Sequence, residues 1–452
     1  MTNTSYLKLY FEKRMLRILL LGIMSGFPWV IIGSALSLWL KESDLSRSAI
    51  GWAGLIFGVY AVNFLWAPLI DRLKIPFLTN KIGHRKSWIF SMQIIILLSL
   101  VCWSFLDPNE NLWLIIAIGL GIAISSATQD ITIDALRIEQ IGKHEGSSIS
   151  AGAAISVVGW WTGYKIGGVI SLISADLFEK QGIENYWQYS FIVLTLIIIL
   201  CSIGLLFIPE QSYRSKFQAQ KKADEKILSK LGDASKTKKI IAWLSGTIIN
   251  PLTSFFKKNS IKVALGILAF IFLFKIGEAF LGRMSIIFYT EIGFSKSDIA
   301  FYSKGIGWIT TITFTLLGGL FAIRMGLLKA MFVSGAVMAL TNLMFSLLAW
   351  VGSSEFLFAL AVLLDDLAAA FATVAFVGFI SALVDRTYTA TQYALLASIG
   401  TAGRTTLASS SGALVDWLNG DWGVFFILTA IMVIPSLICL WFIKDKLKLR
   451  EK

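Results

Sequence analysis

The sequence predicts an all-α membrane protein with twelve transmembrane helices in two homologous six-helix halves. Its 452 residues are 56% hydrophobic and only 15% charged, whereas an average soluble domain is about 25% charged. Apolar stretches of about 20 residues, the length that crosses a bilayer, recur from one end of the chain to the other. One long polar insertion separates two groups of these stretches. Water would not solvate such a chain, so lipid is its expected solvent.

The expected crossings are the apolar runs between polar or charged breaks. In the first half they lie near residues 15–40, 48–70, 87–106, 112–136, 148–175 and 187–208. In the second half they lie near 261–289, 297–321, 330–352, 356–385, 391–416 and 423–443. The expected organisation is therefore a bundle over 1–208, a linker over 209–260 and a second bundle over 261–452. The first run is too long for the core of a signal peptide, so we expect a retained helix.

Positive charge predicts the orientation, because Lys and Arg near helix ends stay on the cytoplasmic side. The start of the chain, the loop after residue 70 and the C-terminal tail are basic, whereas the alternate loops carry few cations. We therefore expect a multi-pass protein of the bacterial inner membrane with both termini in the cytoplasm.

The formal charge of +12 does not predict nucleic-acid binding. The excess lies in loops and tail, where topology and anionic lipid account for it. The linker has a Lys-rich front and a mixed rear that contains Ile240, Trp243 and Ile248. That rear is either an amphipathic helix on the membrane surface or a solvated tether between the halves.

No pattern in the chain predicts an enzyme, a metal site or a cofactor. His84 and His144 fall in loops and the three cysteines are scattered through apolar runs, so no metal-ligand spacing exists. A phosphate-binding Walker motif is also absent from the sequence. If the chain moves a solute across the bilayer, an ion gradient or the solute's own gradient must drive that movement, since no ATP-binding motif is present. A membrane enzyme or a non-transporting receptor stays as an alternative of another class.

The loop after the second crossing carries Asp71 and Arg72, followed by Gly83 to Lys86 (GHRK). This arrangement resembles the loop motif of the major facilitator transporters, which also have two six-helix halves and bind substrate near the midplane between them. In that family these residues lock the cytoplasmic gate. The resemblance therefore implies gate roles for Asp71, Arg72 and Arg85.

Longer strings resemble the AmpG family of muropeptide permeases. They are GFPWVIIGSALSLWL from Gly26, LWAPLIDR from Leu65, SATQDITIDA from Ser126, and Ala375 to Leu396 with its central TATQYALL. The resemblance spans nearly the whole chain outside the linker. It implies proton-coupled import of N-acetylglucosaminyl-1,6-anhydro-N-acetylmuramyl peptides from periplasm to cytoplasm, for cell-wall recycling and indirectly for β-lactamase induction. Another amphipathic anion, such as an acyl-CoA or a lipid-linked sugar, is the alternative cargo.

Carboxylates within the fourth crossing are candidates for proton coupling and gating, because an ionisable residue in a membrane is expensive to keep. Asp130 and Asp134 are four residues apart and share one helix face. Asp130 lies deeper, so it is either a proton carrier or a permanently paired carboxylate. Asp134, with Arg137 one turn on, is expected in a salt bridge of the cytoplasmic gate, facing Arg72 or Arg85.

The tenth crossing offers Asp365 and Asp366 near its middle, which are adjacent and so point about 100° apart. One of them can face the central cavity as a second proton site. Asp385 lies at the cytoplasmic end of this crossing, where we expect it to repeat the gate role of Asp134.

Cations inside the crossings predict an anion-binding cavity between the halves. Lys165 and Arg404 lie in the fifth and eleventh crossings, which are repeat partners, and each is followed by an acidic residue. For Lys275 a simpler reading is an ion pair with Glu278 one turn away. Lys304 and Gln129 are further candidates for binding the ligand. Tyr60, Trp161 and Trp308 could stack on sugar rings, with helix packing or the interfacial aromatic belt as the more common role of such residues. Asn63 could donate to a sugar hydroxyl or bridge two helices. The expected partners are an anionic sugar-peptide, protons and membrane lipids, and the expected state is a monomer.

Overall fold

The structure is a computed structural model of the chain. It describes residues 3–45, 54–142, 145–210, 213–231, 236–294 and 307–447. In these ranges every regular element is a helix. His144 and Lys304 lie outside the described residues, as does the side chain of Trp308.

The helices that precede the linker reproduce the six crossings expected there, although the described part of the second begins only at residue 54 and is made of short pieces. They are α1 (Asn3–Tyr10), α2 (Lys13–Val30), η1 (Ile31–Ala35), α3 (Leu36–Glu42), η2 (Gly54–Gly58), α5 (Val59–Val62), η3 (Asn63–Leu65), α6 (Ala67–Arg72), α7 (Leu78–Ile82), α8 (His84–Trp103), α9 (Pro108–Glu139), α10 (Gly146–Lys180) and α11 (Tyr186–Leu206).

The helices that follow the linker form the other six crossings. They are α14 (Ile261–Leu273), α15 (Ile276–Glu291), α17 (Gly307–Met325), α18 (Leu327–Val351), α19 (Glu355–Leu383), η5 (Arg386–Tyr388), α20 (Thr389–Ala408), α21 (Ser411–Trp417), α22 (Trp422–Ile431), α23 (Ile434–Ile443) and η6 (Lys444–Lys446). Among the described residues, eight helical segments are long and apolar enough to cross a membrane by themselves, and shorter apolar helices accompany them. The all-helical, twelve-crossing fold is confirmed.

Two helices occupy the linker, α12 (Arg214–Leu231) and α13 (Lys236–Asn259). In α13 the side chains of Ile248, Ile249 and Leu252 are exposed. The limits of the linker at residues 209 and 260 stay a prediction.

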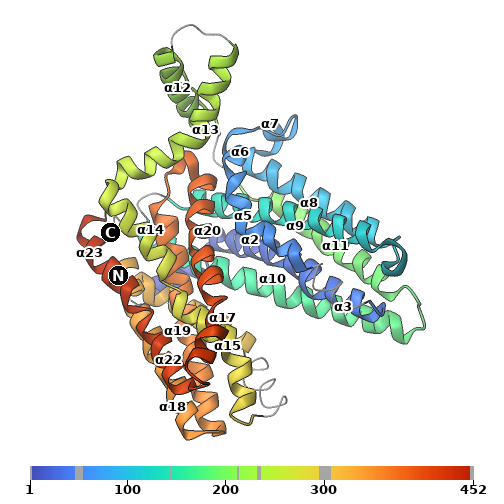
Figure 1. The fold of residues 1–452 in the computed structure, drawn as a ribbon. Helices are drawn as coiled ribbons and strands as arrows, with labels where there is room; N and C mark the ends of the chain where they lie inside the picture. Colours follow the sequence, from blue (N-terminus) through green and yellow to red (C-terminus); the bar gives the residue numbers. More distant parts are fainter. Residues whose placement is uncertain are drawn as a thin grey trace.

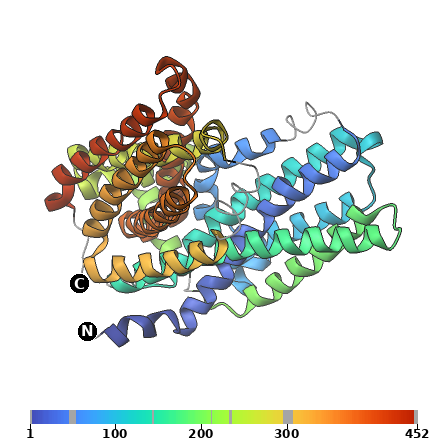
Figure 2. The ribbon, with the colours of Figure 1, turned by 90° about the horizontal axis from the view of Figure 1, so that it is seen from below.

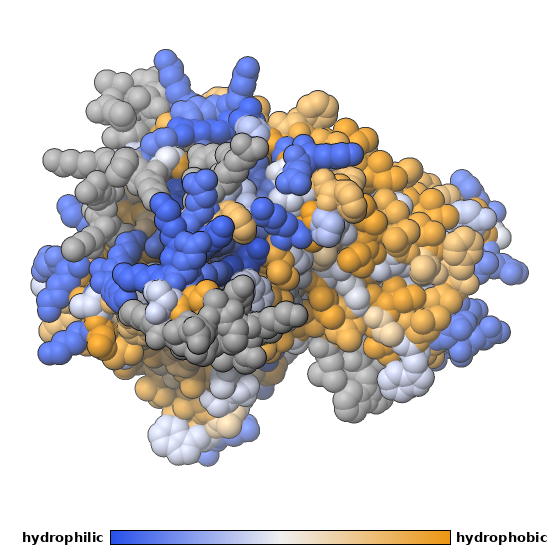
Figure 3. Space-filling model, turned by 90° about the horizontal axis from the view of Figure 1, so that it is seen from above, coloured by the Kyte–Doolittle hydropathy of each residue, from blue (hydrophilic) through white to orange (hydrophobic). Residues whose placement is uncertain are grey.

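The two groups of helices diverge from the end of the molecule that carries α12 and α13 (Figure 1), and they are also separate in the view from below (Figure 2). We call this end the linker face; it comprises α6, α7, α12, α13 and the start of α20. The ends of α3 and α18 lie far from it and far from each other. Hydrophilic side chains gather on the linker face, whereas the flank of the first bundle is hydrophobic (Figure 3). That distribution matches an aqueous face above a lipid-embedded belt.

Glycines let α2 and α10 approach until their backbones touch. A Cβ atom on Gly159 would lie 2.5 Å from the carbonyl oxygen of Leu19, and one on Gly22 would lie 2.9 Å from the Cα atom of Gly159. The same holds one turn on, where Gly163 meets Ile23 and Gly26 meets Trp160. Small residues four apart on both helices are typical of tight packing in membranes, where the hydrophobic effect does not hold helices together. The two helices can therefore move only as one body.

We expect Gly159→Val to destabilise the protein by about 1–3 kcal/mol, because the added side chain has no space and must separate the two helices. Gly168→Val is the matched control on the same helix, since a Cβ atom there meets nothing within 4 Å. Thermal unfolding of the detergent-purified variants measures the difference. Equal melting temperatures for the two variants would contradict the close packing.

Candidate functional site

Asp71 joins the two halves at the linker face. It lies in the last turn of α6, one residue before the end of that helix, and is 1% exposed. Its Oδ2 accepts hydrogen bonds from the backbone N–H of Thr391 at 2.8 Å and from the Thr391 hydroxyl at 2.7 Å. Thr391 lies in the first turn of α20, so the carboxylate caps a helix of the other half and faces the positive end of its dipole.

Arg85 holds the same carboxylate from the other side. Its Nη2 donates to Asp71 Oδ1 at 2.5 Å and to Glu139 Oε1 at 3.1 Å. All three side chains are buried, and Glu139 also accepts from Lys216 Nζ at 2.5 Å. Burial lowers the pKa of Lys216, while the Glu139 carboxylate acts in the opposite direction. Because each charge is paired, this buried network is stable only as a whole.

The linker helix α12 reaches into this network, which the sequence did not indicate. Arg72 donates through two nitrogens to the two oxygens of Asp224, at 2.6 and 3.0 Å. Gln220 Nε2 donates to the Asp71 carbonyl oxygen and to the Thr387 carbonyl oxygen, each at 3.3 Å. The ring of Tyr213 stacks on His84 with 3.9 Å between centroids. The front of the linker is therefore a packed helix that contacts both halves.

Asp134 belongs to a second link between the halves. Arg137 Nη2 donates to Asp134 Oδ1 at 3.0 Å and to Ser381 Oγ on α19 at 3.1 Å, and its guanidinium lies 5.6 Å from the ring centroid of Tyr393. The expectation that Asp134 faces Arg72 or Arg85 is wrong, since those arginines pair with Asp224 and with Asp71 and Glu139. Which arginine pairs with Asp134 across helices depends on how the helices are rotated against each other, which the sequence does not show. The pair of Asp134 with Arg137, three residues apart on one helix, was predictable from the sequence.

Asp385 caps a turn at this face: its Oδ1 accepts the backbone N–H of Thr387 at 2.8 Å. Asn63 also bridges the halves, because its Oδ1 accepts from Ser398 Oγ on α20 at 3.3 Å.

Asp130 lies on α9 within reach of α2. Its Oδ1 accepts from Ser25 Oγ at 2.8 Å and its Oδ2 from the indole Nε1 of Trp29 at 3.5 Å. No cation pairs with it among the described residues. Its neighbour Gln129 is 1% exposed and donates to the carbonyl oxygen of Met24 at 2.7 Å, while its own Oε1 has no partner in the described part of the chain.

Aromatic rings surround this carboxyl group. The ring of Trp29 lies with its centroid 4.3 Å from Tyr60, 5.2 Å from Phe57 and 5.8 Å from Trp160. On α10, Trp160 stacks on Tyr164 at 5.5 Å and meets the edge of Trp161 at 5.1 Å. The sequence indicated Tyr60 and Trp161 as candidates for contacts with sugar, without placing them beside Asp130. It did not single out Trp29, Phe57 or Ser25, although Trp29 lies in the string from Gly26 that resembles the AmpG family.

Two of the predicted cations have no partner in the described part of the chain. Lys165 on α10 and Arg404 on α20 are half-buried, and neither forms a hydrogen bond or an ion pair with any described residue. Lys275 is different: its Nζ binds Glu278 Oε2 at 2.9 Å and Thr373 Oγ1 at 2.8 Å. The simpler reading of Lys275 as a paired residue therefore agrees with its geometry.

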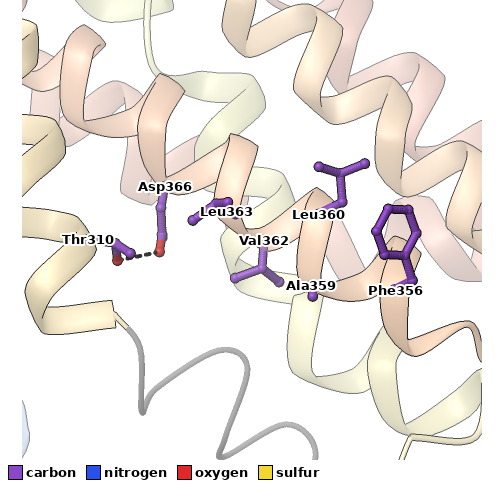
Figure 4. Close-up of a pocket in the computed structure, with 7 residues that line it drawn as sticks. All are labelled: Thr310, Phe356, Ala359, Leu360, Val362, Leu363 and Asp366. Atoms are coloured by element: carbon purple, nitrogen blue, oxygen red, sulfur yellow. Dashed lines mark hydrogen bonds between the residues drawn. The ribbon is translucent and has the colours of Figure 1, made fainter.

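Asp365 and Asp366 point to different neighbours, as their adjacency predicted. Asp365 lies within electrostatic range of Lys275 and Glu278 beside α15. Asp366 accepts from Thr310 Oγ1 on α17 at 3.4 Å and lines a cavity of about 240 Å³ (Figure 4). The other lining residues, which are all apolar and all on α19, are Phe356, Ala359, Leu360, Val362 and Leu363.

Comparison with known proteins identifies the relatives of the chain. Residues 18–305 match the model of the Major Facilitator Superfamily. A protein named as the transporter AmpG 4 of Rickettsia conorii is 33% identical over 97% of this chain and 98% of its own length. The anhydromuropeptide permease of Escherichia coli K12 is 28% identical over 97% of this chain and 81% of its own length.

Solved structures share the fold. A fucose:proton symporter of E. coli has a TM-score of 0.65 at 14% identity, covering 95% of this chain and 99% of its own. A proton:xylose symporter has a TM-score of 0.61 at 15% identity, covering 100% of this chain and 99% of its own.

We expect Asp71→Asn to weaken the closed linker face by about 3–5 kcal/mol, because Arg85 loses a buried carboxylate and α20 loses its charged cap. The reporter is Ala394→Cys in a background without the native cysteines, since Ala394 is 3% exposed at this junction. A water-soluble maleimide should label it faster in the Asp71 variant.

Asp176→Asn is the matched control, because its partner Lys180 is exposed and such pairs contribute little. Labelling of the Asp71 variant at the rate of this control would show that Asp71 does not hold the face closed.

Proposed function

The chain belongs to the AmpG family of the major facilitator superfamily, and from this premise we propose that it imports anhydromuropeptides together with protons. The cargo is the class of N-acetylglucosaminyl-1,6-anhydro-N-acetylmuramyl peptides released by peptidoglycan turnover. The relative named as an anhydromuropeptide permease supports this choice. The chain is a multi-pass membrane transporter, and the bacterial inner membrane is its proposed location.

The linker face is proposed to be the cytoplasmic side. Its basic residues support this orientation, because Lys and Arg are retained there during insertion. Both chain ends would then lie in the cytoplasm. With the linker face held together by Asp71, Arg85 and Arg137, substrate would enter from the periplasm, between the diverging ends of the two bundles.

The observation that carries the proposal is a pair of cations, at corresponding places in the two halves, that have no partner among the residues the structure describes. A cation in the middle of a bilayer costs about 2.5–3.5 kcal/mol by insertion scales, so Lys165 and Arg404 are not expected without a use. Each can bind a carboxylate of the peptide stem. A ligand held by both would bridge the halves, which is what an alternating-access transporter needs from its substrate.

The aromatic side chains around Asp130 suit the sugar part of the cargo. Trp29, Tyr60, Trp160 and Trp161 are packed near one another and offer apolar faces on which a pyranose ring can lie. The cations and the rings together fit a molecule that is acidic at one end and a disaccharide at the other.

Asp130 is the proposed proton carrier of the first half, and one of Asp365 and Asp366 that of the second. An ionised carboxylate without a cation opposes passage through the closed, dehydrated state of the transporter, whereas a protonated one does not. Reorientation would therefore require a proton at Asp130, which ties proton entry to substrate entry. Release of both into the cytoplasm would need the linker face to open.

Uptake into proteoliposomes tests the function. Labelled anhydromuropeptide should accumulate when an inward proton gradient is imposed and should only equilibrate when a protonophore collapses it. At zero membrane potential, a pH difference of two units is worth about 2.7 kcal/mol per proton, enough for a roughly 100-fold gradient of a cargo that enters with one proton. Equal uptake under both conditions would remove the coupling, and uptake equal to that of empty liposomes would remove the cargo.

We expect Lys165→Gln and Arg404→Gln each to raise the KM for the muropeptide about tenfold or more, since each loses a charge-assisted hydrogen bond. Lys180→Gln is the matched control, because Lys180 lies on the same helix with its side chain 71% exposed. Initial uptake rates at varied substrate concentration measure the effect. If the Lys165 variant kept the KM of this control, Lys165 would not contact the cargo.

A further inference from the structure

Trp29 lies where the first crossing changes its winding. The α-helix α2 contains Pro28 and ends at Val30, and the next five residues, Ile31–Ala35, form a π-helix. A proline lacks the backbone N–H that a regular helix needs, so the turn around it is easily widened. Such π-segments are frequent at functional sites.

The indole of Trp29 contributes two different surfaces. Its Nε1 is 3.5 Å from Asp130 Oδ2, whereas the other carboxylate oxygen accepts from Ser25 at 2.8 Å. A donor at 3.5 Å is at the outer limit of a hydrogen bond, so a small rotation of the ring either strengthens the bond or breaks it. The Ser25 bond is short and does not depend on the ring.

The ring of Trp29 is the meeting point of three elements. It contacts Phe57 of η2, Tyr60 of α5 and Trp160 of α10. It is only half-buried, so part of its surface is left for a ligand. A ligand that packs on this ring would therefore contact the Trp29 side chain directly. The position of that side chain determines whether one of the two hydrogen bonds of Asp130 forms.

We propose that Trp29 is a positioning residue that couples binding of the sugar to protonation of Asp130. This inference rests on the proposed function and gives a second role, beside that of a surface for the sugar, to the indole of Trp29. A sugar ring packing on the indole turns its N–H away from Oδ2. The carboxylate then keeps only the Ser25 donor, its ionised form is less favoured, and a proton binds at Oδ2. Substrate and proton thereby bind together.

The charged and titratable groups around Asp130 allow this step. Asp134 lies one turn away on the same helix, and Tyr60 faces Asp130 from α5. From α2 only the neutral donors Ser25 and Trp29 reach it. Asp134 already accepts two hydrogen bonds from Arg137. Trp29, whose ring is only half-buried, is thus the donor to Asp130 that a ligand packing on it can move.

Two variants distinguish the role of the indole N–H from the role of the ring face. Trp29→Phe keeps an aromatic ring and removes the N–H donor, whereas Trp29→Leu removes both. Trp113→Phe is the matched control, since Trp113 is 76% exposed near the start of α9 and lies far along that helix from Asp130. All are full-length proteins, purified and checked for an unchanged melting temperature before they are compared.

Proton uptake on ligand binding is the first readout. Adding anhydromuropeptide to the detergent-solubilised protein in weakly buffered solution with a pH indicator should cause the wild type and the Trp113 variant to take up protons. Trp29→Phe should take up fewer than half as many over the pH range in which the wild type responds. Uptake into proteoliposomes by this variant should reach its half-maximal rate at a higher pH, because its Asp130 holds a proton without the ligand.

The Michaelis constant is the second readout. Trp29→Phe should keep a KM within about threefold of the wild type, and Trp29→Leu should raise it about fivefold to tenfold through loss of ring packing. Trp29→Phe with the proton uptake and pH profile of the wild type would overturn the coupling role. Trp29→Leu with an unchanged KM would overturn the sugar contact.

The same measurements distinguish the two proposals. If the wild type transports muropeptide and the Trp29 variants behave like Trp113→Phe, the inference alone is wrong. If the wild type transports no muropeptide, the proposed function is wrong and the inference falls with it.

Discussion

The structure depends first on the burial of Asp71. A carboxylate that is 1% exposed is tolerable only if every lone pair is used, and here an arginine of its own half and the first turn of α20 in the other half use them. Such a group is stable while the halves are in contact and strongly unfavourable once they part. This junction, together with the bond from Arg137 to Ser381 beside it, holds the two bundles together at the linker face, while their other ends diverge.

Away from the linker face, the ionisable side chains are arranged differently. At the linker face acids and bases neutralise one another, whereas Lys165, Arg404 and Asp130 lack an opposite charge within the described parts of both halves. Ion pairs between the halves stabilise one conformation, whereas a buried charge without a partner is a candidate site for binding a ligand or a proton. The close backbone contact of α2 with α10 then matters for function, because it keeps Asp130's neighbours and Lys165 in one rigid unit.

Sequence reasoning predicted the features that depend on local spacing. Apolar runs predicted the twelve crossings, because the bilayer thickness sets their length, and pairs three residues apart, Asp134 with Arg137 and Lys275 with Glu278, were visible as helix neighbours. Contacts between helices were not predictable. Nothing in the spacing links Arg72 to Asp224, Arg85 to Glu139 or Trp29 to Asp130, since each contact depends on how two helices are rotated against each other.

The junction has an inner and an outer layer that differ in their access to dissolved ions. Arg85 and Asp71 are 2% and 1% exposed, whereas Asp224, the partner of Arg72 on α12, is 23% exposed. At physiological ionic strength the screening length in water is about 8 Å, and it acts on exposed pairs far more than on buried ones. The ion pair between Arg72 and Asp224 should therefore weaken in concentrated salt, while the buried pair of Arg85 and Asp71 persists. The salt concentration of the surrounding solution should then affect how often the two bundles separate at the linker face.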